Sequence, residues 1–196
     1  MQHSATLIDT VFAGKGSRSL LRDGAIALLA TGLLTLSAKV QVPFYPVPMT
    51  MQSLVVLVIG AAFGWRLGTA TVMLYMLQGL AGLPVFAGTP EKGLGLAYMM
   101  GPTGGYLLGF VAAAFVTGLL AERGWTRSAL GALAAMTIGH AVIFLFGFAW
   151  LAALIGAGKA YLGGVAPFYA ATLFKTLLGA ALLPAAWALV KRARRA

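Results

Sequence analysis

The sequence is poor in charged side chains and has no cysteine. Asp, Glu, Lys and Arg make up only 9% of its 196 residues, whereas a soluble domain has about 25%. The absence of cysteine excludes disulfide bonds and thiolate metal sites. Hydrophobic residues account for 60% of the chain and occur in continuous apolar runs. This composition predicts an all-α integral membrane protein and argues against a transmembrane β-barrel, whose strands alternate.

Acidic residues are the scarcest charged class. The four that occur lie at the ends of apolar runs or between them: Asp9, Asp23, Glu91 and Glu122. A proton- or sodium-coupled carrier usually has a carboxylate within the membrane, so such a carrier is not favoured. The sequence also lacks metal-ligand spacings, a carboxylate pair at depth and a phosphate-binding G-x-x-x-x-G-K-[ST] loop. We therefore expect no enzyme, no ATPase, no metal and no cofactor.

Six apolar segments are candidate membrane spans. They cover residues 21–40, 49–63, 67–83, 106–120, 130–155 and 167–190. The sequence therefore predicts a single membrane domain over residues 1–196, with an N-terminal cytoplasmic segment at 1–19, a six-helix bundle at 20–190 and a basic cytoplasmic tail at 191–196.

The distribution of positive charge gives an independent test of the six spans. With a cytoplasmic N-terminus, three basic residues fall outside: Lys39, Lys92 and Lys159. Ten fall inside: Lys15, Arg18, Arg22, Arg66, Arg123, Arg127, Lys191, Arg192, Arg194 and Arg195. This asymmetry obeys the positive-inside rule and places both termini in the cytoplasm, which requires an even number of spans. It also explains the net charge of +10 without a nucleic-acid partner.

Two of the three loops predicted to lie outside are rich in proline, glycine and large apolar side chains. They read "QVPFYPVPMTMQ" and "LPVFAGTPEKGLGLAYMMGPTGGY". Loops with this much apolar surface fold back onto the protein, so a ligand is expected on the outer side. Gln52 lies beside the first loop, which favours a ligand contact. Tyr75 and Gln78 are more consistent with hydrogen bonds between helices.

One cation, Lys175, lies inside the last apolar segment. A charge at that depth requires a partner or a watery cavity, and no carboxylate in the chain lies at a comparable depth. An external anion is therefore a candidate partner, and snorkelling is the alternative. Thr172, on the same helical face, either adds a hydroxyl to the same pocket or bonds back to its own helix. His140 is interpreted as a neutral histidine bonded to a neighbouring helix.

Small residues recur at every fourth position of the first segment. Ala27, Thr31 and Thr35 form a face suited to close helix contact, either within the protein or with another subunit.

Three stretches, taken in order, resemble the BioY family of biotin-binding S components of energy-coupling factor transporters. They are "VPFYPVPMTMQSLVVLVIGAAFGWRLG", "LAGLPVFAGTPEKG" and "GPTGGYLLGF". The resemblance implies six helices, biotin bound at the outer face, membrane lipid around the chain, and a coupling transmembrane protein and ATPase subunits as partners. Many members carry "PGDxxK" where this chain has "AATLFK", so Thr172 stands at the position of the family's aspartate and Lys175 at that of its lysine.

The resemblance and the residues together give a set of expected site residues. Lys175 would pair with the biotin carboxylate, aromatic side chains would cover the rings, and polar groups would bind the ureido ring. The full set is Lys175, Thr172, Gln52, Phe44, Phe86, Tyr98, Thr103, Gly104 and Tyr106. By the same resemblance, Ala27, Thr31 and Thr35 would contact the coupling protein.

The resulting prediction is a biotin-binding subunit of a vitamin uptake transporter in a bacterial inner membrane. The alternatives are an S component for another anionic vitamin such as lipoate, a stand-alone facilitator, and an intramembrane enzyme acting on lipid. The lack of deep carboxylates and metal ligands argues against the enzyme.

Overall fold

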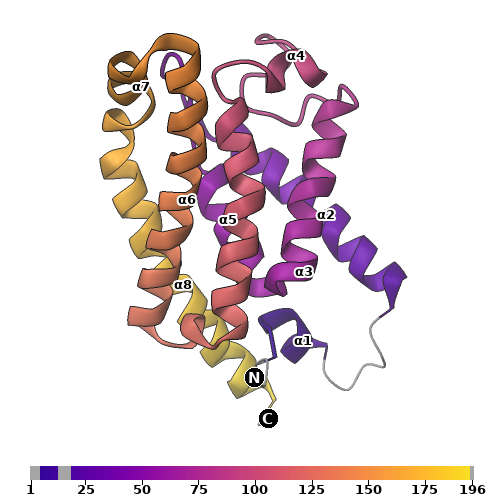
Figure 1. Cartoon of the computed structure of the whole chain (residues 1–196). Helices are drawn as coiled ribbons and strands as arrows, with labels where there is room; N and C mark the ends of the chain where they lie inside the picture. Colours follow the sequence, from indigo (N-terminus) through magenta and orange to yellow (C-terminus); the bar gives the residue numbers. More distant parts are fainter. Residues whose placement is uncertain (1–4, 13–18, 195–196) are drawn as a thin grey trace.

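The computed structural model describes residues 5–12 and 19–194, which form a bundle of long helices capped by short elements (Figure 1). Lys15, Arg18, Arg195 and His3 lie outside the described residues. The long helices are α2 (Leu20–Lys39), α3 (Gln52–Leu80), α5 (Gly104–Glu122), α6 (Ala129–Ile155) and α8 (Tyr169–Ala193). The short elements are α1 (Leu7–Val11), β1 (Gln41–Val42), β2 (Met49–Thr50), α4 (Gly95–Met99), η1 (Trp125–Arg127), α7 (Ala157–Gly164) and η2 (Ala166–Phe168).

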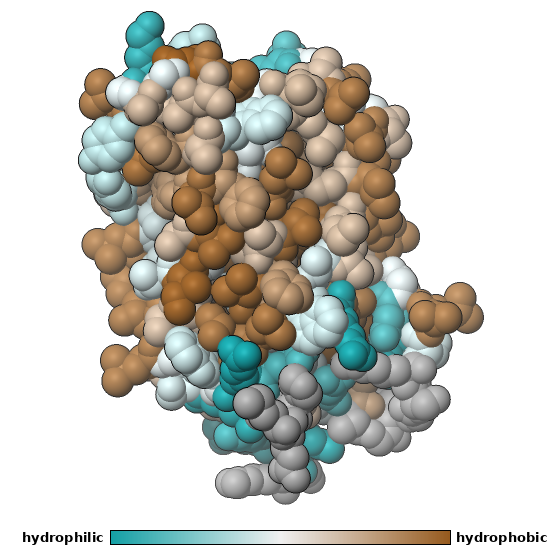
Figure 2. Space-filling model, in the orientation of Figure 1, coloured by the Kyte–Doolittle hydropathy of each residue, from teal (hydrophilic) through white to brown (hydrophobic). Residues whose placement is uncertain are grey.

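The surface is that of a multi-pass membrane protein. Within the described ranges, five segments are long and apolar enough to cross a membrane: 20–39, 52–80, 104–122, 129–155 and 157–193. Figure 2 shows hydrophobic side chains over the middle of the molecule, and hydrophilic ones gathered at the end where the termini lie. This arrangement agrees with the membrane class predicted from composition.

Helix α3 is a hairpin of two antiparallel halves, because the chain reverses at Gly64. Gly64 has φ 82° and ψ 172°, a conformation that glycine adopts without steric cost. Gln52 Nε2 donates to Tyr75 Oη over 2.7 Å, although the two residues are 23 apart in sequence. In a continuous helix they would be about 34 Å apart. The reversal falls between the predicted segments 49–63 and 67–83, and the second half of α3 rises toward α4 (Figure 1).

Helix α5 packs against both halves of the hairpin and is the most buried of the long helices. The buried share of its apolar stretch is 67%, against 50% or less for the others. Glycines allow this close approach. A Cβ at Gly118 would meet the backbone of Trp65, and one at Gly60 would meet the backbone of Ala114. Because the obstacles include backbone atoms, a change of side-chain rotamer would not relieve the clash.

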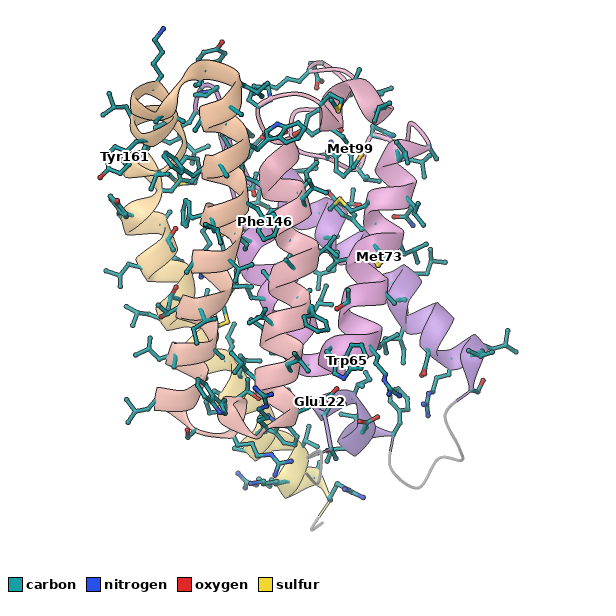
Figure 3. All side chains as sticks on the ribbon, in the orientation of Figure 1. Trp65, Met73, Met99, Glu122, Phe146 and Tyr161 are labelled. Carbon is teal, nitrogen blue, oxygen red and sulfur yellow. The ribbon has the colours of Figure 1, made fainter. Side chains whose placement is uncertain are left out.

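The base of the hairpin is closed by the N-terminal segment and by the end of α5. Thr6 and Asp9 form a capping box at the start of α1, and Leu7 is buried. Glu122 accepts from the backbone N–H of Trp65 at 3.3 Å, directly after the reversal, and Figure 3 shows these two residues side by side. Part of the segment predicted only as a cytoplasmic extension therefore belongs to the folded bundle.

The small face of α2 packs inside the chain rather than on its surface. Ala27 and Thr31 are 6% and 2% exposed, and Thr31 Oγ1 accepts from Gln78 Nε2 of α3 at 3.1 Å. Thr35 is half-buried and donates to the carbonyl of Thr31. Of the two arrangements expected for this small face, the structure shows packing within the chain, where small side chains bring α2 close enough to α3 for a hydrogen bond between the helices.

Candidate functional site

A cavity lies among the helices beneath the β1–β2 loop and the segment before α5. It encloses about 60 Å³. Five stretches of the chain line it: the start of α3 with the preceding loop, the loop after α3 together with α4, the first half of α5 with the residue before it, the middle of α6, and the beginning of α8 with the preceding turn. The lining residues are Val47, Pro48, Thr50, Gln52, Ser53, Ala87, Tyr98, Thr103, Tyr106, Leu107, Phe110, His140, Ile143, Phe144, Phe168, Thr172 and Lys175.

Lys175 lies in the cavity wall and is only 5% exposed. Its Nζ donates to the carbonyl oxygen of Thr50 and to Ser53 Oγ, both at 2.9 Å. Both acceptors are neutral, and within the described part of the chain Lys175 makes no ion pair. A lysine ammonium has three donors, so the two bonds leave one N–H for a ligand.

His140 lies deeper in the same cavity and connects α6 to α8. It is 3% exposed, and its Nδ1 lies 3.0 Å from the Met136 carbonyl and 3.0 Å from Thr176 Oγ1. This agrees with the interpretation of His140 as a histidine bonded to a neighbouring helix. Its Nε2 is buried and has no hydrogen-bond partner among the described residues.

Gln52 holds the two halves of the hairpin together at the level of the cavity. Its amide donates to Tyr75 Oη, which in turn donates to the carbonyl of Val85 at 2.8 Å. Both side chains are buried, at 3% and 0% exposure. Tyr75 and Gln78 make the interhelical bonds predicted for them, and Gln52 combines such a bond with a place in the cavity wall.

The loop after α3 is fixed by donors that reach its backbone carbonyls from three elements. Lys39, at the end of α2, donates to the carbonyls of Phe86 and Thr89 at 3.0 and 2.9 Å and to Thr89 Oγ1 at 3.2 Å. Tyr98 Oη of α4 donates to the carbonyl of Ala87 at 2.6 Å. Together with the bond from Tyr75, these contacts convert a glycine- and proline-rich stretch into a fixed wall.

Of the nine residues expected from the sequence, six line the cavity: Lys175, Thr172, Gln52, Tyr98, Thr103 and Tyr106. Some of their hydroxyls already have hydrogen-bond partners within the protein. Tyr106 Oη, for example, donates to the carbonyl of Gly164 at 2.7 Å.

The remaining three expected residues lie outside the lining. Phe86 is 1% exposed, packs between Tyr75 and Tyr98, and fills the space above Gly79. Phe44 is 38% exposed and contacts Phe168, whose ring lines the cavity, with ring centroids 6.4 Å apart. Gly104 packs against Met99 and Trp150, where a Cβ would clash. These residues support the wall rather than form it.

Sequence reasoning missed several lining residues. Thr50 and Ser53 were overlooked although they flank Gln52, and they hold Lys175. Phe110, Ile143, Phe144 and Phe168 supply apolar wall from α5, α6 and η2. Apolar residues in a membrane helix look alike in sequence whether they face lipid or a cavity, so no sequence signal marks them.

The fold and the cavity together define a class: a multi-pass helical membrane protein with a small cavity between its helices, lined by apolar rings and a few polar groups. Comparison with known proteins identifies the particular family. The family model described as "BioY family" matches residues 5–192, so the chain belongs to the BioY family. It is therefore a transporter protein rather than an enzyme.

Relatives agree with this assignment, and a solved structure shares the fold. The "Probable biotin transporter BioY" of Pyrococcus horikoshii is 35% identical over 154 residues, covering 79% of this chain and 89% of the relative. The "Biotin transporter BioY" of Rhizobium etli is 38% identical over 167 residues, covering 81% and 86%. The crystal structure of the S-component for biotin from an ECF-type ABC transporter superposes with a TM-score of 0.71 at 20% identity, covering 92% of this chain and 96% of that one.

Proposed function

We propose that this chain binds biotin in the described cavity and serves as the substrate-binding subunit of a vitamin uptake transporter. The observation that carries the proposal is the environment of Lys175. This buried cation donates to two neutral oxygens, and its third N–H remains available for a ligand. Biotin has a carboxylate tail and an apolar bicyclic head. A carboxylate that reaches Lys175 forms a charge-assisted bond in a low-dielectric site, where such bonds are strong.

The walls suit the remainder of biotin. Aromatic side chains from three elements, Phe110, Phe144 and Phe168, line the space beside Lys175. Gln52, Thr103 and Thr172 add polar groups, so the ureido ring has several possible partners. The proposal rests on this combination of one cation, several rings and few polar groups, which is typical of vitamin-sized sites.

Binding requires the covering loop to move. The cavity of about 60 Å³ holds only a few water molecules. The segment between β1 and β2 is the candidate lid, because Phe44 and Tyr45 are 38% and 91% exposed and only two short strands fix its ends. We infer that biotin enters as this lid lifts.

We further propose that the chain crosses the membrane six times, with both termini in the cytoplasm of a bacterium. The two halves of α3 each cross once, and α2, α5, α6 and α8 supply the other four crossings. In the described part, the basic residues near the base of the bundle (Arg22, Arg66, Arg123, Arg127 and Arg192) support this orientation. The cavity then opens to the outside of the inner membrane.

Delivery inward is proposed to depend on a coupling transmembrane protein and ATPase subunits, because the sequence has no phosphate-binding loop. Since Ala27 and Thr31 are buried, we assign the contact to an exposed side of α2. A Cβ at Gly24 or Gly32 meets nothing within 4 Å, and the neighbouring Leu28 and Leu36 are 59% and 68% exposed. Gly24, Leu28, Gly32 and Leu36 recur every four residues and form one exposed row, named here the outer row of α2.

The test is calorimetric titration of the purified chain with biotin and with biotinamide, which lacks the carboxylate charge. We expect Lys175→Ala to weaken biotin binding about 10- to 100-fold, the loss expected for one charge-assisted bond, and to affect biotinamide much less. Lys159→Ala, which removes an exposed lysine of α7, is the matched control and should leave both affinities unchanged.

Each alternative outcome has a clear meaning. Equal losses for acid and amide would show that Lys175 does not bind the tail. Absence of biotin binding together with tight binding of lipoate would replace the ligand while keeping the class. Uptake by the chain alone in vesicles without ATP would favour a stand-alone facilitator.

A further inference from the structure

We propose that His140 is a specificity-determining residue: its Nε2 accepts a hydrogen bond from a ureido N–H of the ligand, whose head lies deeper than its carboxylate tail. This inference rests on the proposed function and concerns the same cavity.

The tautomer follows from the partners of Nδ1. The Met136 carbonyl, 3.0 Å away, can only accept, so Nδ1 carries the proton. Thr176 Oγ1, also 3.0 Å away, then accepts from the same N–H, which is shared between the two oxygens. A second proton would place another positive charge near Lys175 in an apolar interior, which is unfavourable. Nε2 therefore has a lone pair and acts as an acceptor.

This acceptor has no partner within the protein. His140 is 3% exposed and lines the cavity, and Nε2 is buried without a hydrogen bond among the described residues. Buried polar atoms in native structures are nearly always satisfied, by protein, by ordered water or by a ligand. The position of this atom in a ligand cavity points to a ligand donor.

The chemistry of the donor can be specified. A carboxylate has only acceptor oxygens, so the biotin tail can satisfy Lys175 but would meet the Nε2 lone pair with repulsion. The ureido ring has two N–H donors. It is the part of biotin that can satisfy His140, and His140 Nε2 in turn supplies the acceptor that Thr172, at the position of the family's aspartate, provides only weakly.

The relative depth of the two side chains fixes the orientation of the ligand. Lys175 Nζ is bound at the level of Ser53, near the start of α3. Gly139, which precedes His140, faces the side chain of Leu57. Leu57 is one helical turn further along α3, about 5–6 Å deeper. The head therefore enters first, and the tail remains beneath the lid.

The test compares wild type, His140→Asn and Thr176→Val with biotin and with biotin methylated at either ureido nitrogen. The asparagine amide nitrogen replaces Nδ1 and keeps the bond to Met136, but no atom replaces Nε2. We expect His140→Asn to weaken biotin about 10- to 100-fold. One of the two methylated ligands already lacks this hydrogen bond, so His140→Asn should lower the affinity for that ligand by no more than about threefold. Thr176→Val, which keeps Nε2, should preserve the preference for biotin over that ligand.

A second measurement does not depend on any variant of His140. The chain has two histidines, so the ¹⁵N spectrum of the ring nitrogens in a His3→Gln protein reports His140 alone. Nε2 should resonate as an unprotonated nitrogen and shift when biotin is added.

The outcomes separate this inference from the proposed function. If wild type does not bind biotin, both fail. If wild type binds biotin but His140→Asn binds it equally well, or loses biotin and both methylated ligands by the same factor, only the role of His140 is overturned. A protonated Nε2 in the spectrum would also overturn it.

Discussion

Replacing Tyr75 by phenylalanine tests whether one hydroxyl connects the hairpin to the wall of the site. Tyr75 Oη accepts from Gln52 at 2.7 Å and donates to the Val85 carbonyl at 2.8 Å, so it joins both halves of α3 to the following loop. The substitution removes one oxygen atom and keeps the ring, which packs edge-on against Phe86 at 5.4 Å between centroids. Packing is therefore preserved while two hydrogen bonds are lost.

The magnitude follows from those two bonds. Interhelical hydrogen bonds in membrane proteins average about 0.6 kcal/mol and reach about 1.7 kcal/mol. Tyr75 is fully buried and Gln52 is 3% exposed, so the amide and the carbonyl that lose their partner gain no access to water. We therefore expect Tyr75→Phe to lower the free energy of unfolding by about 1–3 kcal/mol, the sum over both bonds.

The measurement is reversible unfolding in mixed micelles with a rising fraction of SDS, followed by circular dichroism. Tyr161→Phe is the matched control, because the bond between Tyr161 and Tyr169 joins two exposed hydroxyls and its loss should change stability by less than about 0.5 kcal/mol. Gln52→Met and the double variant complete a mutant cycle. Equal stability of Tyr75→Phe and wild type, or strict additivity in the cycle, would refute the bridging role.

Two further predictions concern the outer loop and the partner. Lys39→Met removes three hydrogen bonds to the loop after α3, so limited proteolysis within residues 82–94 should accelerate. Biotin should also bind more weakly, while the ratio of the affinities for the acid and the amide stays unchanged. A loop as resistant to proteolysis as in wild type would contradict this prediction. Gly32→Leu, on the outer row of α2, should leave biotin affinity unchanged and reduce co-purification with the coupling protein; full recovery of the complex would exclude this face.

The sequence was sufficient for the long helices because hydrophobic length determines them. The segments predicted at 21–40 and 130–155 agree with α2 (Leu20–Lys39) and α6 (Ala129–Ile155) to within one residue. Helix α7 (Ala157–Gly164) was missed, since eight glycine-rich residues carry no span signal. Docking of α1 was also missed, because it depends on contacts with residues far along the chain, such as Arg127, which donates to the carbonyl of Ala5.

The site was predicted less completely because its geometry depends on distant pairs. The sequence identified Lys175 as unusual, but its acceptors Thr50 and Ser53 are 125 and 122 residues away. Phe86 was expected to cover the ligand rings because it lies in an apolar outer loop. It is a core residue instead, because Gly79 leaves room for its ring, and such room is visible only when both residues are placed in space.

The scarcity of acidic residues bears directly on the charge of Lys175. An internal carboxylate beside Lys175 would neutralise it, and a ligand carboxylate would then have to displace a buried ion pair, which is costly. Here the two acceptors are a carbonyl and a hydroxyl, both neutral. They fix the position of the ammonium without removing its charge, so an incoming anion meets a preorganised cation and needs to break no bond. The chain has four acidic residues, and none of them is paired with Lys175 in the described structure, so this cation stays available to the proposed ligand.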